Sequence, residues 1–135
     1  MIIDASVALK WIVPEAESDL AIALFEKGAL SAPSLVLVEV ANALWKITQR
    51  GGLRAAEGFG PEIASLSRLM TLVDHPGLAA RALALAVELE HPVYDCMYLA
   101  LAEEQNDVLV TADLKLLARL AGTAHEMRAQ ALSAT

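Results

Sequence analysis

Short apolar runs alternate with longer segments of helical period along the whole chain. Runs of strand length occur at residues 1–3, 70–74 and 108–111, with shorter strands predicted near 31–34 and 123–127. The segments between them repeat their apolar positions with the period of a helix, and they cover residues 7–11, 20–25, 35–49, 53–69, 78–90, 96–104 and 114–120. Apolar runs of this kind are typical of strands buried on both faces. The alternation predicts an α/β fold with a parallel sheet covered by helices on both sides.

The helix predicted over residues 35–49 has two distinct faces. Ser34 is its predicted N-cap, and the glycines at 51 and 52 end it. Glu39, Asn42 and Lys46 recur on one polar face. The opposite face is apolar and comprises Val36, Val40, Ala41, Leu44 and Ile47. The helix predicted over residues 96–104 is apolar on nearly every side, so we expect it to be buried.

Composition bounds the class of protein. With 135 residues, the chain is expected to form a single domain over residues 1–135 with a real core. Its longest stretch without a charged residue, 28–38, has 11 residues, too few to span a bilayer. Its N-terminus lacks the pattern of a signal peptide. A single cysteine, Cys96, fits a reducing compartment, and we expect a cytoplasmic protein that does not contact membranes.

The net charge of −7 argues against a simple polyanion binder, because phosphate contacts normally come from lysine and arginine. That argument weakens if several acids share one metal ion, because a bound cation changes the local sign of charge. Charge alone therefore does not exclude nucleic acid.

Four acids are expected at one edge of the sheet. Asp4 follows the first strand and Asp113 lies two residues past the strand that ends near Val110. Asp95 opens the buried helix, and Glu39 lies on the polar face described above. Right-handed crossovers bring the carboxyl ends of parallel strands and the following helix N-termini to the same edge. Ligands of open α/β sheets collect at this edge.

Each acid also has a purely structural interpretation. Asp95 and Asp113 are plausible helix N-caps, each worth about 1 kcal/mol, and Glu39 is compatible with an ordinary solvated position. Asp4 is harder to explain in this way, because an acid at the end of an apolar strand is costly to bury without a partner. Four gathered carboxylates would raise one another's pKa. Oxygen coordination of Mg²⁺ or Mn²⁺ resolves this repulsion.

The order of these motifs resembles the PIN-domain family. The pattern consists of Asp-x-Ser at Asp4, Glu-x-x-Asn at Glu39, Tyr-Asp-x-x-Tyr at Asp95 and Thr-x-Asp at Asp113. Within that family the chain is similar to VapC-type toxins of toxin–antitoxin pairs, from the Met-Ile-Ile-Asp-Ala-Ser start through residue 127. The resemblance implies a three-layer α/β/α sandwich with a five-stranded parallel sheet, and a Mg²⁺- or Mn²⁺-dependent endoribonuclease.

The resemblance also assigns roles to residues and partners. It implies a catalytic quartet of Asp4, Glu39, Asp95 and Asp113. Asp4, Asp95 and Asp113 are the expected metal ligands, and Glu39 completes the shell or orients water. The expected supporting residues are Ser6, Asn42 and Thr111. A homodimer and a small VapB-like antitoxin are implied, with Trp11 and Ile12 among the candidates for the partner surface.

The remaining candidates have weaker support. Lys10, Lys46, Arg50 and Arg54 are the candidate RNA contacts, because they cluster in sequence near Asp4 and Glu39. The three histidines, His75, His91 and His125, show no ligand spacing. Packing is the expected role of Cys96, Tyr94 and Tyr98, with base stacking as a distant alternative for the tyrosines.

Two other functions remain open from the sequence. An aspartyl phosphotransferase or phosphatase would use Asp4 as its nucleophile, but it would want a second acid at the position of Ser6. A non-catalytic α/β module would bind a cation or a partner for structural reasons. Metal-dependent turnover separates the module from the nuclease, and a covalent acyl-phosphate would identify the phosphotransferase.

Overall fold

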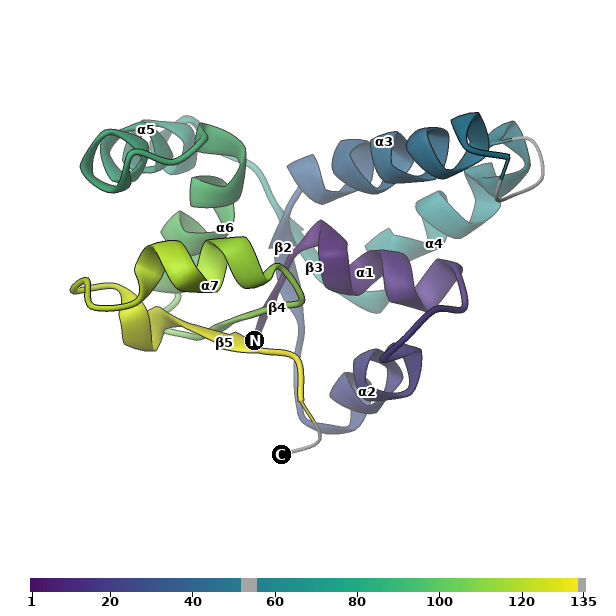
Figure 1. Cartoon of the computed structure of the whole chain (residues 1–135), viewed down its shortest axis with the longest axis horizontal. Helices are drawn as coiled ribbons and strands as arrows, with labels where there is room; N and C mark the ends of the chain where they lie inside the picture. Colours follow the sequence, from purple (N-terminus) through teal and green to yellow (C-terminus); the bar gives the residue numbers. More distant parts are fainter. Residues whose placement is uncertain (52–55, 134–135) are drawn as a thin grey trace.

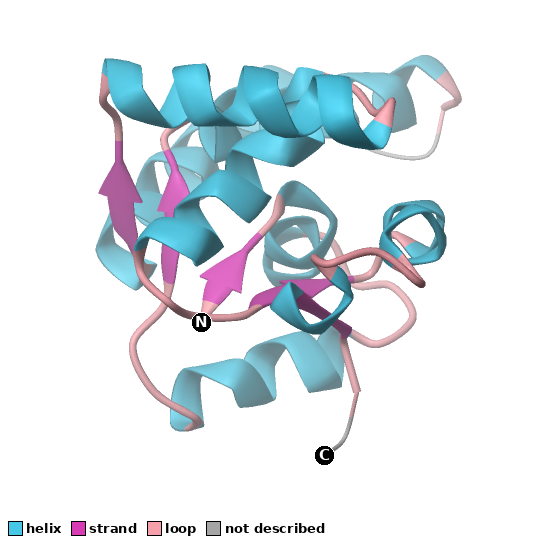
Figure 2. Cartoon of the chain, turned by 90° about the vertical axis from the view of Figure 1, so that its left-hand side faces the viewer, coloured by secondary structure: helices cyan, strands magenta, loops and turns pink. Residues whose placement is uncertain are grey.

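The fold is known from a computed structural model that describes residues 1–51 and 56–133. Five parallel strands form one sheet in the order β3-β2-β1-β4-β5. They comprise β1 (Ile2–Ile3), β2 (Ser31–Pro33), β3 (Thr71–Val73), β4 (Leu109–Thr111) and β5 (Ala129–Ala131). Helices lie on both sides of this sheet (Figures 1 and 2). The structure confirms the predicted three-layer α/β/α sandwich with a five-stranded parallel sheet.

The helices fill the crossovers between consecutive strands. They comprise α1 (Ala5–Ile12), α2 (Ser18–Ala23), α3 (Leu35–Gln49), α4 (Gly60–Leu69), α5 (Pro76–Leu89), α6 (Val93–Glu104) and α7 (Leu114–Leu120). Short 3₁₀ turns η1 (Leu24–Glu26), η2 (Ala56–Phe59) and η3 (Glu126–Arg128) complete the described chain. The strand order moves outward from β1 through β2 to β3 and then returns past β1 to β4. Right-handed crossovers therefore place α5 and α6 on the face opposite α1 to α4.

The core fills both faces of the sheet, and α6 is the most deeply buried helix. Ile2 and Ile3 have no exposed surface, as expected for a strand covered on both faces. Helix α6 packs against β1, β2 and β4, and α5 packs on its outer side. Six of its twelve residues are buried: Cys96, Tyr98, Leu99, Ala100, Leu101 and Ala102. The prediction that this helix is buried is correct.

The last predicted strand is misplaced. Residues 123–125 form a turn, residues 126 and 127 belong to η3, and the strand begins only at Ala129. The Thr123 hydroxyl donates to the Leu120 carbonyl at 2.7 Å and accepts the His125 amide at 3.2 Å. Such local side-chain bonds compete with strand pairing, and they favour a turn at this point.

Helix starts also differ from the prediction. Helices α5 and α6 begin two to three residues earlier than expected, at Pro76 and Val93. Ser34 precedes α3 as predicted, but its side chain makes no capping hydrogen bond. The predicted helix over 53–69 is a 3₁₀ turn followed by α4, and residues 53–55 lie outside the described chain. No helix among the described residues has the length and apolarity needed to cross a membrane.

Candidate active site

Asp4 lies where β1 ends and α1 begins. Its Oδ1 accepts the Val7 amide at 3.2 Å, so the side chain also caps α1. Only 6% of its surface is exposed. The sheet order places β1 in the centre, flanked by β2 and β4. Asp4 is therefore held at the middle of the carboxyl edge of the sheet, the place where the sequence predicts the site.

Two hydroxyl groups fix both oxygens of Asp4. Ser6 Oγ donates to Asp4 Oδ1 at 2.6 Å, and Thr111 Oγ1 donates to Asp4 Oδ2. Both hydroxyls also accept backbone amides, from Ala112 at 2.9 Å and from Asp113 at 3.0 Å. The same hydroxyls thus orient a carboxylate and cap the turn after β4. They join the starts of α1 and α7 across neighbouring strands.

Burial dominates the electrostatics of Asp4. It raises the pKa of this carboxyl group from 3.8 to about 6, although three hydrogen bonds oppose the shift. The negative charge of Asp95 raises this pKa further. None of the ion pairs between described residues includes Asp4. The charged form of Asp4 is therefore held at a cost to folding.

Glu39 extends from α3 toward α6. Its Oε1 accepts a hydrogen bond from the Tyr98 hydroxyl, which comes from the buried side of α6. Burial raises the pKa of Glu39, and the charge of Asp95 raises it too. Burial and Glu39 raise the pKa of Tyr98, so its phenol stays a hydrogen-bond donor at all ordinary pH. Tyr98 thus ties the second candidate acid to the central helix.

Asp95 lies in the first turn of α6. Its Oδ2 pairs with His91 Nε2 at 2.6 Å, and both side chains are largely shielded. The helix itself has Pro92 as its N-cap, so Asp95 does not have the capping role that was its structural alternative. The charge of Asp95 acts on the pKa of both Asp4 and Glu39. These three carboxylates therefore share one electrostatic environment.

Asp113 takes the capping role that the sequence left open. Its Oδ1 accepts the Lys115 amide at 2.9 Å and the Leu116 amide at 3.2 Å, at the start of α7. Its backbone amide bonds Thr111 Oγ1, which in turn holds Asp4. The fourth acid is therefore connected to the site through its backbone, while one carboxylate oxygen is used by α7.

The four carboxylates do not converge on a single point. Within residues 1–51 and 56–133, no three His, Cys, Asp or Glu side chains are arranged to hold one metal ion. In this arrangement Glu39, Asp95 and Asp113 each accept or share a hydrogen bond with a partner of their own, Tyr98, His91 and the α7 amides respectively. The chemistry of the donors nevertheless fits a hard divalent cation, because the edge offers carboxylate and hydroxyl oxygens. Asp4 adds a buried negative charge that lacks a cationic partner among the described side chains.

The predicted RNA contacts fall in different environments. Lys10 Nζ donates to the Ala16 carbonyl at 2.8 Å and pairs with Glu15, so it braces the loop after α1. Lys46 and Arg50 are exposed along the C-terminal half of α3 and at its end. Arg54 lies outside the described residues. Lys46 is thus better placed than Lys10 to meet a phosphate.

Asn42 is exposed and lies between Glu39 and Lys46 on α3. Among the described residues it makes no hydrogen bond to a candidate acid. It lines a cleft of about 530 Å³ together with Glu39, Lys46 and Tyr94. Its predicted supporting role has no direct contact behind it, whereas Ser6 and Thr111 both contact Asp4.

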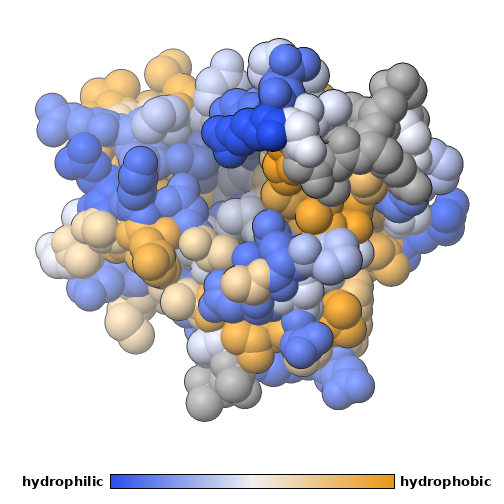
Figure 3. All heavy atoms as spheres, turned by 45° about the vertical axis from the view of Figure 1, so that its right-hand side comes forward, coloured by the Kyte–Doolittle hydropathy of each residue, from blue (hydrophilic) through white to orange (hydrophobic). Residues whose placement is uncertain are grey.

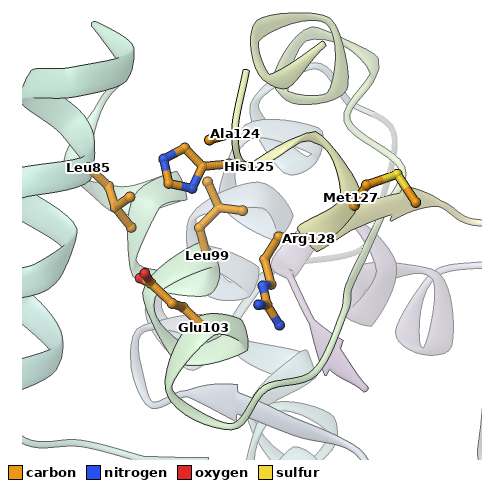
Figure 4. Close-up of a pocket in the computed structure, with 7 residues that line it drawn as sticks. All are labelled: Leu85, Leu99, Glu103, Ala124, His125, Met127 and Arg128. Atoms are coloured by element: carbon orange, nitrogen blue, oxygen red, sulfur yellow. The ribbon is translucent and has the colours of Figure 1, made fainter. Parts of the chain in front are cut away.

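A second cavity lies away from the candidate acids. It has a volume of about 390 Å³ and is lined by Glu103, His125 and Arg128 with apolar neighbours from α5, α6 and the segment before β5 (Figure 4). Glu103 is bound by Arg81 at 2.7 and 2.8 Å, and His125 pairs with Glu88 at 2.5 Å. Glu103 therefore has a cationic partner among the described residues, in contrast to Asp4 at the sheet edge.

Two contacts of the site were missed from sequence. His91 shows no metal-ligand spacing, yet its separation of four residues from Asp95 is the spacing of a side-chain pair. Packing is the role that the sequence predicts for Tyr98, yet this residue lies three residues after Asp95 and so on the same side of α6. The spacing relative to Asp95 could have indicated both residues. It could not have indicated that Tyr98 binds Glu39, because Glu39 lies 59 residues from Tyr98.

Comparison with known proteins agrees with this architecture. The model of the PIN domain matches residues 1–123. Ribonuclease VapC3 of Pyrobaculum aerophilum is 34% identical over 119 residues, covering 86% of this chain and 91% of that protein. Ribonuclease VapC9 of Mycobacterium tuberculosis is 35% identical over 118 residues, covering 86% and 87%. The crystal structure of PAE2754 from Pyrobaculum aerophilum superposes with a TM-score of 0.70 at 29% identity, over 97% of this chain and 87% of that one. The chain belongs to the PIN-domain family and groups there with the VapC-type proteins.

Proposed function

We propose that this protein is a Mg²⁺- or Mn²⁺-dependent endoribonuclease that acts as the toxin of a toxin–antitoxin pair. The observation that carries the proposal is the buried carboxylate of Asp4, which lacks a cationic partner among the described residues, while the charge of Asp95 raises the pKa of both Asp4 and Glu39. A fold built only for stability gains nothing from this arrangement. The relatives that share the fold are named ribonucleases.

The chain's own residues divide the work. Asp4, Asp95 and Asp113 would hold the cation, with Ser6 and Thr111 fixing the orientation of Asp4. Glu39, kept in place by Tyr98, would orient the attacking water. A bound Mg²⁺ or Mn²⁺ supplies charge neutralisation at the phosphate and lowers the pKa of water. Asp95 would then divide its oxygens between the cation and His91, and Asp113 would divide its oxygens between the cation and the α7 amides.

A protein partner is part of the same proposal. On the α1–α4 side of the molecule, apolar atoms form an area bordered by hydrophilic ones (Figure 3). Phe25 and Trp45 are 38% and 53% exposed, and Ile22 is 53% exposed. Trp11 is less available than expected, because its ring contacts Phe25 and its Nε1 donates to the Ala21 carbonyl at 2.9 Å. We propose that the antitoxin and a second copy of the chain use exposed apolar surface of this kind.

Cleavage of a structured RNA pool by the antitoxin-free protein tests the nuclease. We expect cleavage with Mg²⁺ or Mn²⁺, none with chelator, and none from Asp4→Asn or Asp95→Asn. Asp107→Asn is the matched control, because it removes an aspartate at the other end of the same strands. Activity that survived both site substitutions, or that disappeared in the control as well, would contradict the proposal.

No observation favours the two alternatives. Both oxygens of Asp4 accept hydrogen bonds and the side chain is buried, which makes it a poor nucleophile for a phosphotransferase. A non-catalytic module would bind the cation without any turnover, and the cleavage assay separates it directly.

A further inference from the structure

A cleft of about 530 Å³ continues from the candidate active site along α3. Its volume is within the range of small-molecule sites, about 300–1,000 Å³. Glu39 belongs to both the cleft and the site, and Tyr94 in its wall is the neighbour of Asp95. In Figure 1, α3 and the α5–α6 pair stand on either side of the carboxyl ends of the central strands. A ligand in this cleft would therefore lie beside Glu39, one of the four candidate acids.

The two ends of the cleft differ in charge. Glu39 and Lys46 are seven residues apart on α3, which is two helical turns or about 10 Å along the axis. Asn42 lies between them and offers an amide that both donates and accepts hydrogen bonds. The cleft therefore leads from a cation-attracting end to a phosphate-attracting end.

The walls of the cleft expose a ring and an aliphatic side chain. Tyr94 is 63% exposed in the first turn of α6, and Val38 on α3 is 66% exposed. Apolar groups of this size are costly to leave in water at about 25 cal/mol per Å². They are suited to a flat ligand that covers them.

We propose that this cleft binds one unpaired nucleotide of the RNA substrate. The base stacks on Tyr94, Asn42 hydrogen-bonds its edge, and Lys46 binds a phosphate. Proteins recognise RNA mainly through such unpaired bases, stacked on aromatic rings. The inference rests on the proposed ribonuclease function and adds a subsite to it. A cation, an amide and a ring beside a phosphodiester-cleaving centre favour a nucleotide over an apolar peptide.

Measurements of RNA affinity separate the contribution of the Tyr94 ring from that of the Lys46 ammonium group. The probe is a fluorescein-labelled 12-nucleotide single-stranded RNA, measured by fluorescence anisotropy with Ca²⁺ at several salt concentrations, with gels to check that it stays intact. Tyr94→Ala should weaken binding by about 5- to 150-fold, the range for one stacked base, without changing the salt dependence. Lys46→Gln should reduce the slope of log affinity against log salt by about 0.7, the value for one phosphate contact on a single strand.

Two matched variants serve as controls for the Tyr94 and Lys46 substitutions. Tyr94→Phe keeps the ring and should bind like the wild type. Lys27→Gln removes another exposed lysine, outside the cleft, and should leave the salt slope unchanged. Circular dichroism of each variant checks that it is folded, and all three positions are exposed at the surface.

The outcomes separate the subsite from the nuclease. If the wild type binds and cleaves RNA while Tyr94→Ala and Lys46→Gln bind equally well, the subsite is wrong, the nuclease stands, and the cleft is left to a protein partner. If Tyr94→Phe loses as much affinity as Tyr94→Ala, stacking is not the interaction and the inference is overturned. If the wild type neither binds nor cleaves RNA, the proposed function fails and the subsite fails with it.

Discussion

Two aspartates mark the opposite ends of the central strands, and their environments are opposite as well. At the amino end, Asp107 precedes β4 and its Oδ2 pairs with the Met1 amino group at 2.9 Å. That ammonium group holds the pKa of Asp107 below its usual range. At the carboxyl end, Asp4 is buried, lacks an ion-pair partner among the described residues, and has its pKa raised to about 6.

The difference shows which end of the sheet is optimised for stability. A paired, half-exposed aspartate satisfies its charge and costs the fold little. A buried carboxylate whose pKa is raised by burial and by the charge of Asp95 opposes folding at neutral pH, and such groups are typical of functional sites. The comparison therefore points to the carboxyl end as the functional end, by physical argument alone.

The two ends of the sheet should differ most in their effect on catalysis. Asp4→Asn should lower the rate of RNA cleavage by about a thousand-fold or more, because it removes a charge that would hold the metal. Asp107→Asn should leave the rate within about two-fold of wild type. Single-turnover cleavage rates measure both, and equal losses in the two variants would remove the distinction between the two ends.

Divalent cations should stabilise the protein by binding at the carboxyl end of the sheet. At a hundred times the dissociation constant, Mg²⁺ or Mn²⁺ should raise the free energy of unfolding of the wild type by about 2.7 kcal/mol. Asp4→Asn should lose most of this gain, and Asp107→Asn should keep it. Urea titrations with and without the ion measure the effect, and an equal gain in all three proteins would place the cation elsewhere.

Without divalent ions, Asp4→Asn should stabilise the protein. The folded-state pKa of about 6 lies above the unfolded value of 3.8, so the native state binds the proton more tightly. Stability should therefore fall as pH rises from about 4 to about 6 and stay low above that window. At pH 7.5 the substitution should add about 1–2 kcal/mol, less than the about 3 kcal/mol of the full shift, because the amide reproduces the hydrogen bonds only in part.

Chemical denaturation across pH 4 to 8 tests this sign. The wild-type curve should decline through the window while the curve of Asp4→Asn changes less. If Asp4→Asn destabilised the protein at pH 7.5 in the presence of chelator, the charged carboxylate of Asp4 would not oppose folding.

Thr111→Val should disturb the orientation of the Asp4 carboxylate while leaving its charge in place. It keeps the shape of the side chain but removes the hydroxyl that donates to Asp4 and accepts the Asp113 amide. With that buried partner lost, the free energy of unfolding should fall by about 1–2 kcal/mol. Affinity for Mn²⁺, measured by calorimetry, should fall as well, and unchanged affinity would show that Thr111 does not orient the site.

The smallest effect is expected at the amino end. Asp107→Asn should reduce stability at pH 7 by about 0.5 kcal/mol, because its ion pair is partly exposed and screened by salt. Its lowered pKa means that the stabilisation is present above the unfolded value and is lost as pH falls through the folded one. A larger loss than that of Thr111→Val would reverse the ranking of the two ends.

Much of the fold could be predicted because it depends on local pattern. The runs around Ile2 and Val110 indicated buried strands, and the apolar wheel of residues 96–104 indicated the buried helix. The last strand could not be placed, because hydrogen bonds of Thr123 override a weak pattern. The acids were identified as a set, but the long-range partner of Glu39 could not be predicted, because Tyr98 lies 59 residues away.

The sequence by itself determined the order of strands and helices, and with it the edge to which the acids are brought. Handed crossovers and the periods of helix and strand are short-range properties of the chain. Only the tertiary structure decided which acid is buried without a cationic partner among the described residues and which ones have partners. The contacts responsible join Asp4 to Thr111 and Glu39 to Tyr98, across 107 and 59 residues. Burial and long-range neighbours set the state of a carboxylate, and neither exists before the chain is folded.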